Sequence, residues 1–347
     1  MKHSDVFELY LTFDDVLIKP NISAVKPSQV DIGSFVTKKI RLDLPILSAA
    51  MDRVTETEMA IVLGKLGGLG VLHRNNTAEA QVAMVKKVKT VGLMTAAACG
   101  PTDLERAKLL DKTGCDILVL DSAHGHNTHV VDGAKQIKKA VKAQVIVGNV
   151  ATAESAQPIC EFADGIKVGI GPGSICTTRI VSGVGVPQIS AIAEVAEVAR
   201  KYKVPVIADG GMHYPGDGAK ALAAGADTLM FGSVLAGTTE APGKVIIKDG
   251  LQLKEYRGMG SAAVMAENQS SDRYLQKDAK KKTTEGISAY VPFKGSIEPI
   301  IDEFSGGLRL AYSYVGASNI TEFHSRAKLI RITPAGMTES KPHGVIQ

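Results

Sequence analysis

The stretch GIKVGIGPGSICTTR, residues 165–179, holds the pattern that decides the fold of this 347-residue chain. An apolar run at 165–170 leads into a loop that presents two further glycines, several hydroxyl side chains and the thiol of Cys176. Such a loop at the end of a strand offers free backbone groups that can hold an ion and a thiol that can attack an electrophilic carbon. The strand-then-loop order predicts one βα unit with chemistry at the end of its strand.

Seven other short apolar runs share this pattern and alternate with helical stretches. After Pro187, for example, Ile189, Ile192 and Val195 recur at steps of three, which marks one face of a helix. Eight βα units favour a closed (β/α)8 barrel, a TIM barrel, over an open doubly wound sheet, with the active site at the C-terminal ends of the strands. The predicted strands are 45–48, 68–72, 95–99, 116–120, 144–147, 165–168, 205–208 and 227–231.

Composition excludes several classes of protein. Apolar residues make up 45% of the chain, enough for a large core, and the net charge of +4 comes from interspersed acids and bases, which argues against nucleic-acid binding. The four cysteines form no CxxC pair, which predicts a reduced, cytoplasmic protein without a zinc site. The N-terminus lacks the apolar core of a signal peptide, and no apolar run is long enough to span a membrane.

Polar and glycine-rich residues follow the predicted strands, where the barrel would place its active site. Two glycine-rich turns follow strands seven and eight, the usual phosphate-binding position of this fold. Asp209 could accept hydrogen bonds from ribose hydroxyls. The polar and glycine-rich segments that follow the strands are 48–52, 121–124, 148–149, 171–179, 209–211 and 232–233.

Residues 244–294 do not continue the barrel pattern. Low apolar content and high charge, including four lysines between 277 and 282, favour a mobile flap inserted after strand eight. Helical patterning resumes at 296–309 as the final barrel helix, and 331–347 form a polar C-terminal tail. We therefore expect one catalytic domain over 1–347, with the flap within it.

Several long motifs resemble the inosine-5′-monophosphate (IMP) dehydrogenase family. They are GPGSICTTR, the preceding DGIKVGIG, ADGG after strand seven, YRGMGS and SSDRY, and the similarity runs from LTFDDVLIKP to GGLR at 306–309. The sister family, GMP reductase, shares the barrel, the cysteine loop and the phosphate turns. Arg273-Tyr274 and RGMGS favour the dehydrogenase, whereas YSYVGAS at 312–318 and VPFKG at 291–295 look more like the reductase. Arg53 stands where both families usually have threonine.

The resemblance also implies what this chain lacks. Most members of the dehydrogenase family carry a pair of regulatory CBS modules between the second barrel helix and the third strand. Here the helix ending near Lys89 runs almost directly into Met94, so the modules are absent, either naturally or by engineering.

By resemblance, Cys176 adds to C2 of IMP, hydride passes to NAD, and a covalent thioimidate is hydrolysed to XMP. Arg273, with help from Tyr274 and from Thr178 relaying to Glu285, would activate the water. The runner-up activity is NADPH-dependent conversion of GMP to IMP. A different class, a non-catalytic nucleotide-binding barrel, would leave the reactive cysteine unexplained. For His124 and His126 we expect packing near NAD or exposure to solvent rather than a catalytic role.

Binding roles follow from the matching motifs. Met259 and Gly260 would contact the hypoxanthine above Met51, Glu285 its N1 edge, and Asp209 the ribose. The other substrate-binding residues, mostly at the phosphate, would be Ser174, Gly210, Gly211, Met212, Gly232, Ser233, Tyr256 and Gly258. Those at NAD would be Asp121, Ser122, Ala123, Gly169 and Gly171.

A potassium ion would be held by the carbonyls of Gly171, Gly173 and Cys176. A neighbouring subunit of a homotetramer would complete that site through Glu339, Ser340 and Lys341. Lys341 departs from the family pattern, and its ammonium could either replace the cation or repel it.

Overall fold

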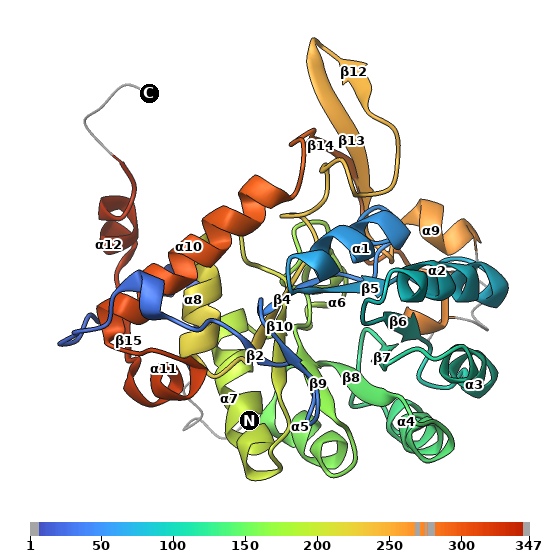
Figure 1. Ribbon diagram of the computed structural model, residues 1–347, viewed down its shortest axis with the longest axis horizontal. Helices are drawn as coiled ribbons and strands as arrows, with labels where there is room; N and C mark the ends of the chain where they lie inside the picture. The colour runs from blue at the N-terminus through green and yellow to red at the C-terminus, as the bar shows by residue number, and fades with distance from the viewer. Residues whose placement is uncertain (1–6, 268–270, 275, 277–281, 343–347) are drawn as a thin grey trace.

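Eight parallel strands close into a barrel, in the order β10-β11-β4-β5-β6-β7-β8-β9 (Figure 1). This computed structural model describes residues 7–267, 271–274, 276 and 282–342. The predicted (β/α)8 barrel is confirmed, and each predicted run coincides with a strand, although β8 continues beyond its run to Val150. The barrel strands are β4 (Ile46–Ser48), β5 (Leu69–Leu72), β6 (Ala96–Cys99), β7 (Ile117–Asp121), β8 (Gln144–Val150), β9 (Gly165–Val168), β10 (Val206–Asp209) and β11 (Thr228–Phe231).

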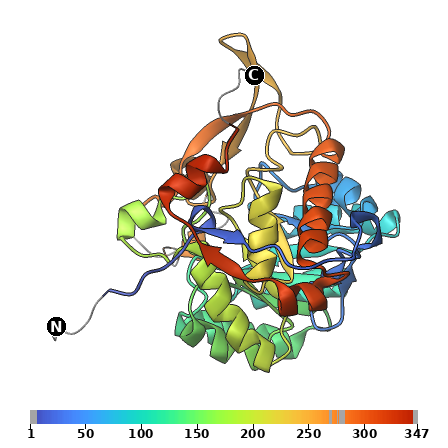
Figure 2. The same cartoon turned by 90° about the vertical axis from the view of Figure 1, so that its left-hand side faces the viewer.

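Helices surround the barrel and follow its strands in chain order. The predicted faces at 189–202 and 104–110 belong to α7 and α3, and the predicted final helix is α10, which packs beside α8 (Figure 2). The outer helices are α1 (Thr57–Lys65), α2 (Ala78–Thr90), α3 (Leu104–Lys112), α4 (Thr128–Ala140), α5 (Ala153–Cys160), α7 (Gln188–Lys201), α8 (Pro215–Ala223) and α10 (Glu298–Val315).

The barrel strands bury both faces. One set of side chains, including Leu47, Val71 and Met230, fills the barrel interior, and the alternate set packs against the helices. The helices approach closely because the facing residues are small: a Cβ added to Gly70 would lie 2.5 Å from the Cα of Ala60 in α1. This close packing explains the high glycine and alanine content.

Three barrel strands are each preceded by an aspartate, and its side chain hydrogen-bonds the barrel strand that comes before it in the chain. The carboxylates of Asp116, Asp164 and Asp227 accept hydrogen bonds from the backbone N–H groups of Thr95, Val145 and Val206 at 2.8, 2.7 and 2.8 Å. Each carboxylate thereby satisfies a donor at the start of the neighbouring strand. The repeated aspartate in the sequence therefore marks the N-terminal end of the barrel.

The inserted segment 244–294 carries an antiparallel sheet that the sequence interpretation missed. Strands β12 (Ile246–Lys248), β13 (Leu251–Arg257) and β14 (Ser288–Pro292) project from the barrel (Figure 1). Asp249 and Gly250, with φ of 51° and 77°, form the two-residue turn between β12 and β13. An Asp-Gly pair between alternating residues is a hairpin signal and could have predicted it. The segment continues with α9 (Ala262–Glu267) and η3 (Ser271–Tyr274).

The remaining elements lie outside the barrel. β1 (Val16–Ile18) pairs antiparallel with β15 (Leu329–Arg331), which joins the two ends of the chain (Figure 2). The others are η1 (Phe13–Asp15), η2 (Pro27–Gln29), the hairpin β2 (Ser34–Phe35) and β3 (Arg41–Leu42), α6 (Thr178–Ser182), α11 (Ile320–Arg326) and α12 (Pro334–Glu339).

Two predicted absences can be compared with the structure. Helix α2 ends at Thr90 and β6 begins at Ala96, so the short connection leaves no room for CBS modules. In the described part of the chain, no helix combines the length and the apolarity that crossing a bilayer requires.

Candidate functional site

The cysteine loop follows β9 and is held by a segment far away in sequence. The N–H of Thr177 donates to the carbonyl of Glu285 at 3.0 Å, and the N–H of Ile287 donates to the carbonyl of Ile175 at 3.1 Å. Cys176 and Gly286 form an antiparallel bridge. The returning end of the insertion therefore sets the position of the thiol.

A chain of hydrogen bonds leads from the thiol to a carboxylate. The Sγ of Cys176 lies 3.2 Å from the Oγ1 of Thr178, which donates to the Oε2 of Glu285 at 2.8 Å. The sequence interpretation placed these three residues together, and the structure brings them into contact. A proton can pass along this chain, because each hydroxyl both donates and accepts.

Arg179 also shapes the loop, and the sequence interpretation did not select it. Its guanidinium donates to the carbonyls of Ile170 and Val186 at 3.2 and 2.6 Å, so it joins the two sides of the loop. Burial lowers the pKa of Arg179, and the nearby Cys176 opposes that shift. Its place at the end of the GPGSICTTR motif was the signal for this role.

A cavity lies beside the cysteine loop, and the predicted phosphate-binding residues line it. Gly210 and Gly211 have φ of 87° and 83°, which side chains rarely adopt, so their backbone can approach a ligand closely. The hydroxyl of the buried Tyr256 lies 3.8 Å from the Sδ of Met51, and burial raises the pKa of this tyrosine. A Cβ at Gly232 would lie 2.8 Å from that hydroxyl.

Most of the predicted substrate, NAD and cation residues line this cavity. They are Met51, Asp121, Gly169, Gly171, Gly173, Ser174, Cys176, Asp209, Gly210, Gly211, Met212, Gly232, Ser233, Tyr256, Gly258, Met259, Arg273, Tyr274 and Glu285.

Beneath the cavity lies a buried lysine that the sequence interpretation did not select. The ammonium of Lys167, in β9, contacts Asp121 at 3.0 Å and Asp209 at 2.7 Å, and it also donates to the side-chain oxygen of Asn149. The amide of Asn149 donates to Asp209 at 2.9 Å. A lysine within an otherwise apolar, fully buried strand was the available signal, because such a charge needs partners.

The flap residues Arg273 and Tyr274 lie over the cavity. The carbonyl of Arg273 accepts a hydrogen bond from the N–H of Ala123 at 2.9 Å and one from the Ser122 hydroxyl, and its guanidinium pairs with Asp121. Burial lowers the pKa of Arg273, and the Arg74 charge adds to the shift, whereas Tyr274 opposes it. Burial likewise raises the pKa of Tyr274.

Other predicted residues lie at the rim or away from the cavity. A Cβ at Gly260 would meet the Tyr274 ring at 2.7 Å, so Gly260 lies directly beneath that ring. The backbone N–H groups of Ser340 and Lys341, in the tail, donate to Gly336 and Thr338 within α12. Helix α12, which contains Glu339 and is followed by Ser340 and Lys341, packs on η1.

We expect the Lys167→Met substitution to lower the free energy of unfolding by about 3–5 kcal/mol, since it leaves the carboxylate of Asp209 without its cationic partner while Asp121 keeps Arg273. Urea denaturation would measure the loss. Lys201→Met, at an exposed lysine paired with Glu197, is the matched control and should change little. Equal stability of the Lys167→Met variant and the wild type would contradict this account of the buried pair.

Comparisons with known proteins agree with this site. Residues 10–343 match the family model described as IMP dehydrogenase / GMP reductase domain. The chain is 43% identical to the IMP dehydrogenase of Cryptosporidium parvum over 381 residues, covering 96% of this chain and 95% of that protein. It is 37% identical to that of Halobacterium salinarum over 467 residues, covering 97% and 93%. It is 40% identical to that of Borreliella burgdorferi over 392 residues, covering 96% and 97%.

Proposed function

Because the chain belongs to the IMP dehydrogenase / GMP reductase family, we propose that it oxidises IMP to XMP with reduction of NAD, a step in guanine nucleotide biosynthesis. The observation that carries this proposal is the hydrogen-bond chain from Cys176 through Thr178 to Glu285, beside a cavity that Arg273 and Tyr274 also line. The thiol supplies a nucleophile, and the flap pair supplies groups for a later hydrolytic step.

In the first step the sulfur of Cys176 bonds to C2 of the purine. The hydrogen on C2 leaves with its electron pair as hydride to NAD, which leaves a thioimidate between Cys176 and the nucleotide. Thr178 and Glu285 lie where they can receive the thiol proton. Ser174, Tyr256 and the glycine turns at 210–211 and 232 hold the phosphate, and Asp209 holds the ribose.

In the second step water attacks C2, the bond between C2 and sulfur breaks, XMP leaves and the thiol is restored. Arg273 and Tyr274 activate this water. This role rests on the resemblance of the Arg273-Tyr274 pair, since an arginine guanidinium ordinarily keeps its proton. Glu285 accepts from Thr178 beside the thiol and offers a further acceptor for the water proton.

The residues that would hold NAD, the acceptor of the hydride, are covered by the flap in this structure. Asp121, Ser122 and Ala123, the residues predicted for NAD, contact Arg273 instead, so the flap and the dinucleotide use the same surface in turn.

A monovalent cation bound by the carbonyls of Gly171, Gly173 and Cys176 would stiffen the loop. Backbone carbonyls are the donors that such ions prefer. Glu339, Ser340 and Lys341 of a neighbouring subunit would complete the site.

Assembly into a homotetramer follows from the same proposal. The projecting sheet carries exposed apolar side chains, including Ile247, Leu251 and Tyr290, at 76%, 63% and 53% exposure. An apolar surface of this kind is suited to cover by another subunit.

Absorbance at 340 nm tests the reaction. We expect it to rise with IMP plus NAD and to stay constant with GMP plus NADPH, because the site is built to take hydride from C2 and then hydrolyse the adduct. The Cys176→Ser variant is the control and should show no rise. A fall with GMP plus NADPH would instead assign the reductase activity.

Replacing Arg273 should separate the two steps. We expect Arg273→Ala to keep the initial burst of NADH and to lower steady-state turnover about 100-fold or more, because water activation is lost. Mass spectrometry of quenched enzyme should then show purine mass on the peptide that holds Cys176. The exposed Arg331→Ala serves as the control, and an Arg273→Ala enzyme with wild-type turnover would refute the role.

Exchanging potassium for tetramethylammonium, which is too large for a carbonyl cage, tests the cation. We expect turnover to fall severalfold and to recover when potassium is restored. Unchanged turnover would show that the loop needs no such ion, as when the ammonium of Lys341 takes its place.

A further inference from the structure

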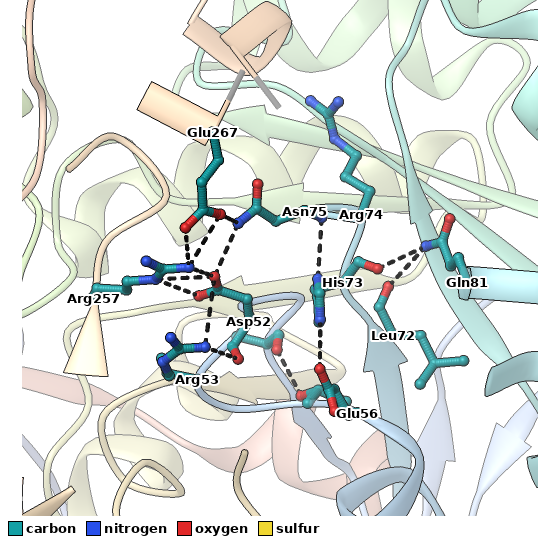
Figure 3. A network of polar contacts seen from close by, with 12 residues as sticks. Asp52, Arg53, Glu56, Leu72, His73, Arg74, Asn75, Gln81, Arg257 and Glu267 are labelled. Atoms are coloured by element: carbon teal, nitrogen blue, oxygen red, sulfur yellow. Dashed lines mark hydrogen bonds and ion pairs between the residues drawn. The ribbon is translucent and has the colours of Figure 1, made fainter. Parts of the chain in front are cut away.

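A buried ion pair joins two loops of the proposed purine site. Asp52 directly follows Met51, and Arg257 directly precedes Gly258; their side chains are 4% and 8% exposed and contact each other, with Nε of Arg257 3.0 Å from Oδ2 of Asp52 (Figure 3). The two residues are 205 positions apart in the chain. The pair therefore connects the loop after β4 to the end of β13 in the inserted segment.

Both members of this pair are charged near neutral pH. Burial alone would raise the pKa of Asp52, but hydrogen bonds from Arg257 and Asn75 outweigh burial, and the pKa is lowered. Burial alone would lower the pKa of Arg257, but its contacts with Asp52 and Glu267 raise it. The two side chains therefore form a buried ion pair between the barrel and β13.

Glu267, the last residue of α9, also contacts this ion pair. Its carboxylate lies 2.9 Å from Nη2 of Arg257 and accepts from the amide of Asn75 at 2.7 Å. The same Asn75 amide donates to Asp52 at 2.9 Å. Arg257 and Asn75 thus lie between the two carboxylates and bind both (Figure 3).

The bond to Glu267 is separable from the rest of the network. Asp52 stays paired with Arg257 without it, and Arg53 adds a second positive charge, 4.0 Å from Asp52 and 2.8 Å from Glu255. Glu267 is 42% exposed, so its removal leaves no buried charge unpaired. Loss of Glu267 would therefore change the attachment of the flap and not the folding of the barrel.

We propose that Glu267 is a positioning residue for the hydrolytic step. Its carboxylate attaches α9 to the Asp52–Arg257 pair and so holds Arg273, six positions further along the chain, over the cysteine loop. Glu267 acts through Arg257 and Asn75 and does not touch the substrate. The inference rests on the proposed function, because it assigns Glu267 to the second of its two steps.

Two substitutions test this role. We expect Glu267→Ala to leave the rate of the NADH burst unchanged and to lower the rate of hydrolysis about fivefold, the low end of common coupling strengths. The adduct on Cys176 should accumulate, and the KM for NAD should fall because the flap competes less well for its surface. Glu267→Gln keeps an acceptor oxygen and should recover part of the hydrolysis rate.

Glu255→Gln is the matched control, since Glu255 is 39% exposed and also pairs with an arginine beside Asp52, but lies on β13. It should leave both rates unchanged. Equal loss of both rates in Glu267→Ala, or no change in either, would overturn the proposal. Failure of the wild-type enzyme to form NADH or a Cys176 adduct would instead overturn the proposed function.

Discussion

The site depends on one buried ammonium, that of Lys167, between two carboxylates at the mouth of the barrel. A charge inside a parallel strand is costly unless it is paired, and Asp121, Asp209 and Asn149 provide its partners. The pairing brings the ends of β7, β8, β9 and β10 into one polar layer above an apolar interior. Because the strands hold these ends rigidly, the two carboxylates keep fixed positions.

Charge balance at this layer connects binding to chemistry. Lys167 compensates one of the two carboxylates, and in this structure Arg273 compensates the other by pairing with Asp121. A group that replaced Arg273 at that surface would meet the carboxylate of Asp121, with the buried guanidinium of Arg74 next to it.

The cysteine loop shows a second dependence, on segments remote in sequence. Cys176 pairs with Gly286 through backbone contacts, and Thr178 pairs with Glu285 through side chains. The barrel provides the strand end, but the insertion holds the loop and supplies the acceptor. The insertion is therefore part of the candidate site.

The sequence by itself predicted the barrel, which the structure confirms, and most residues of the candidate site, because both depend on local order. Short apolar runs alternating with helical faces predict βα units, and in such a barrel the residue after each strand faces the mouth, so Cys176, Asp209 and the glycine turns could be found by position. Only the tertiary structure decided the partners of Lys167, the contacts of Arg179 and the network around Asp52. These contacts join residues up to 205 positions apart. No local pattern encodes such contacts, because they arise when barrel closure and the returning insertion bring remote charges together in a medium where each must find a partner.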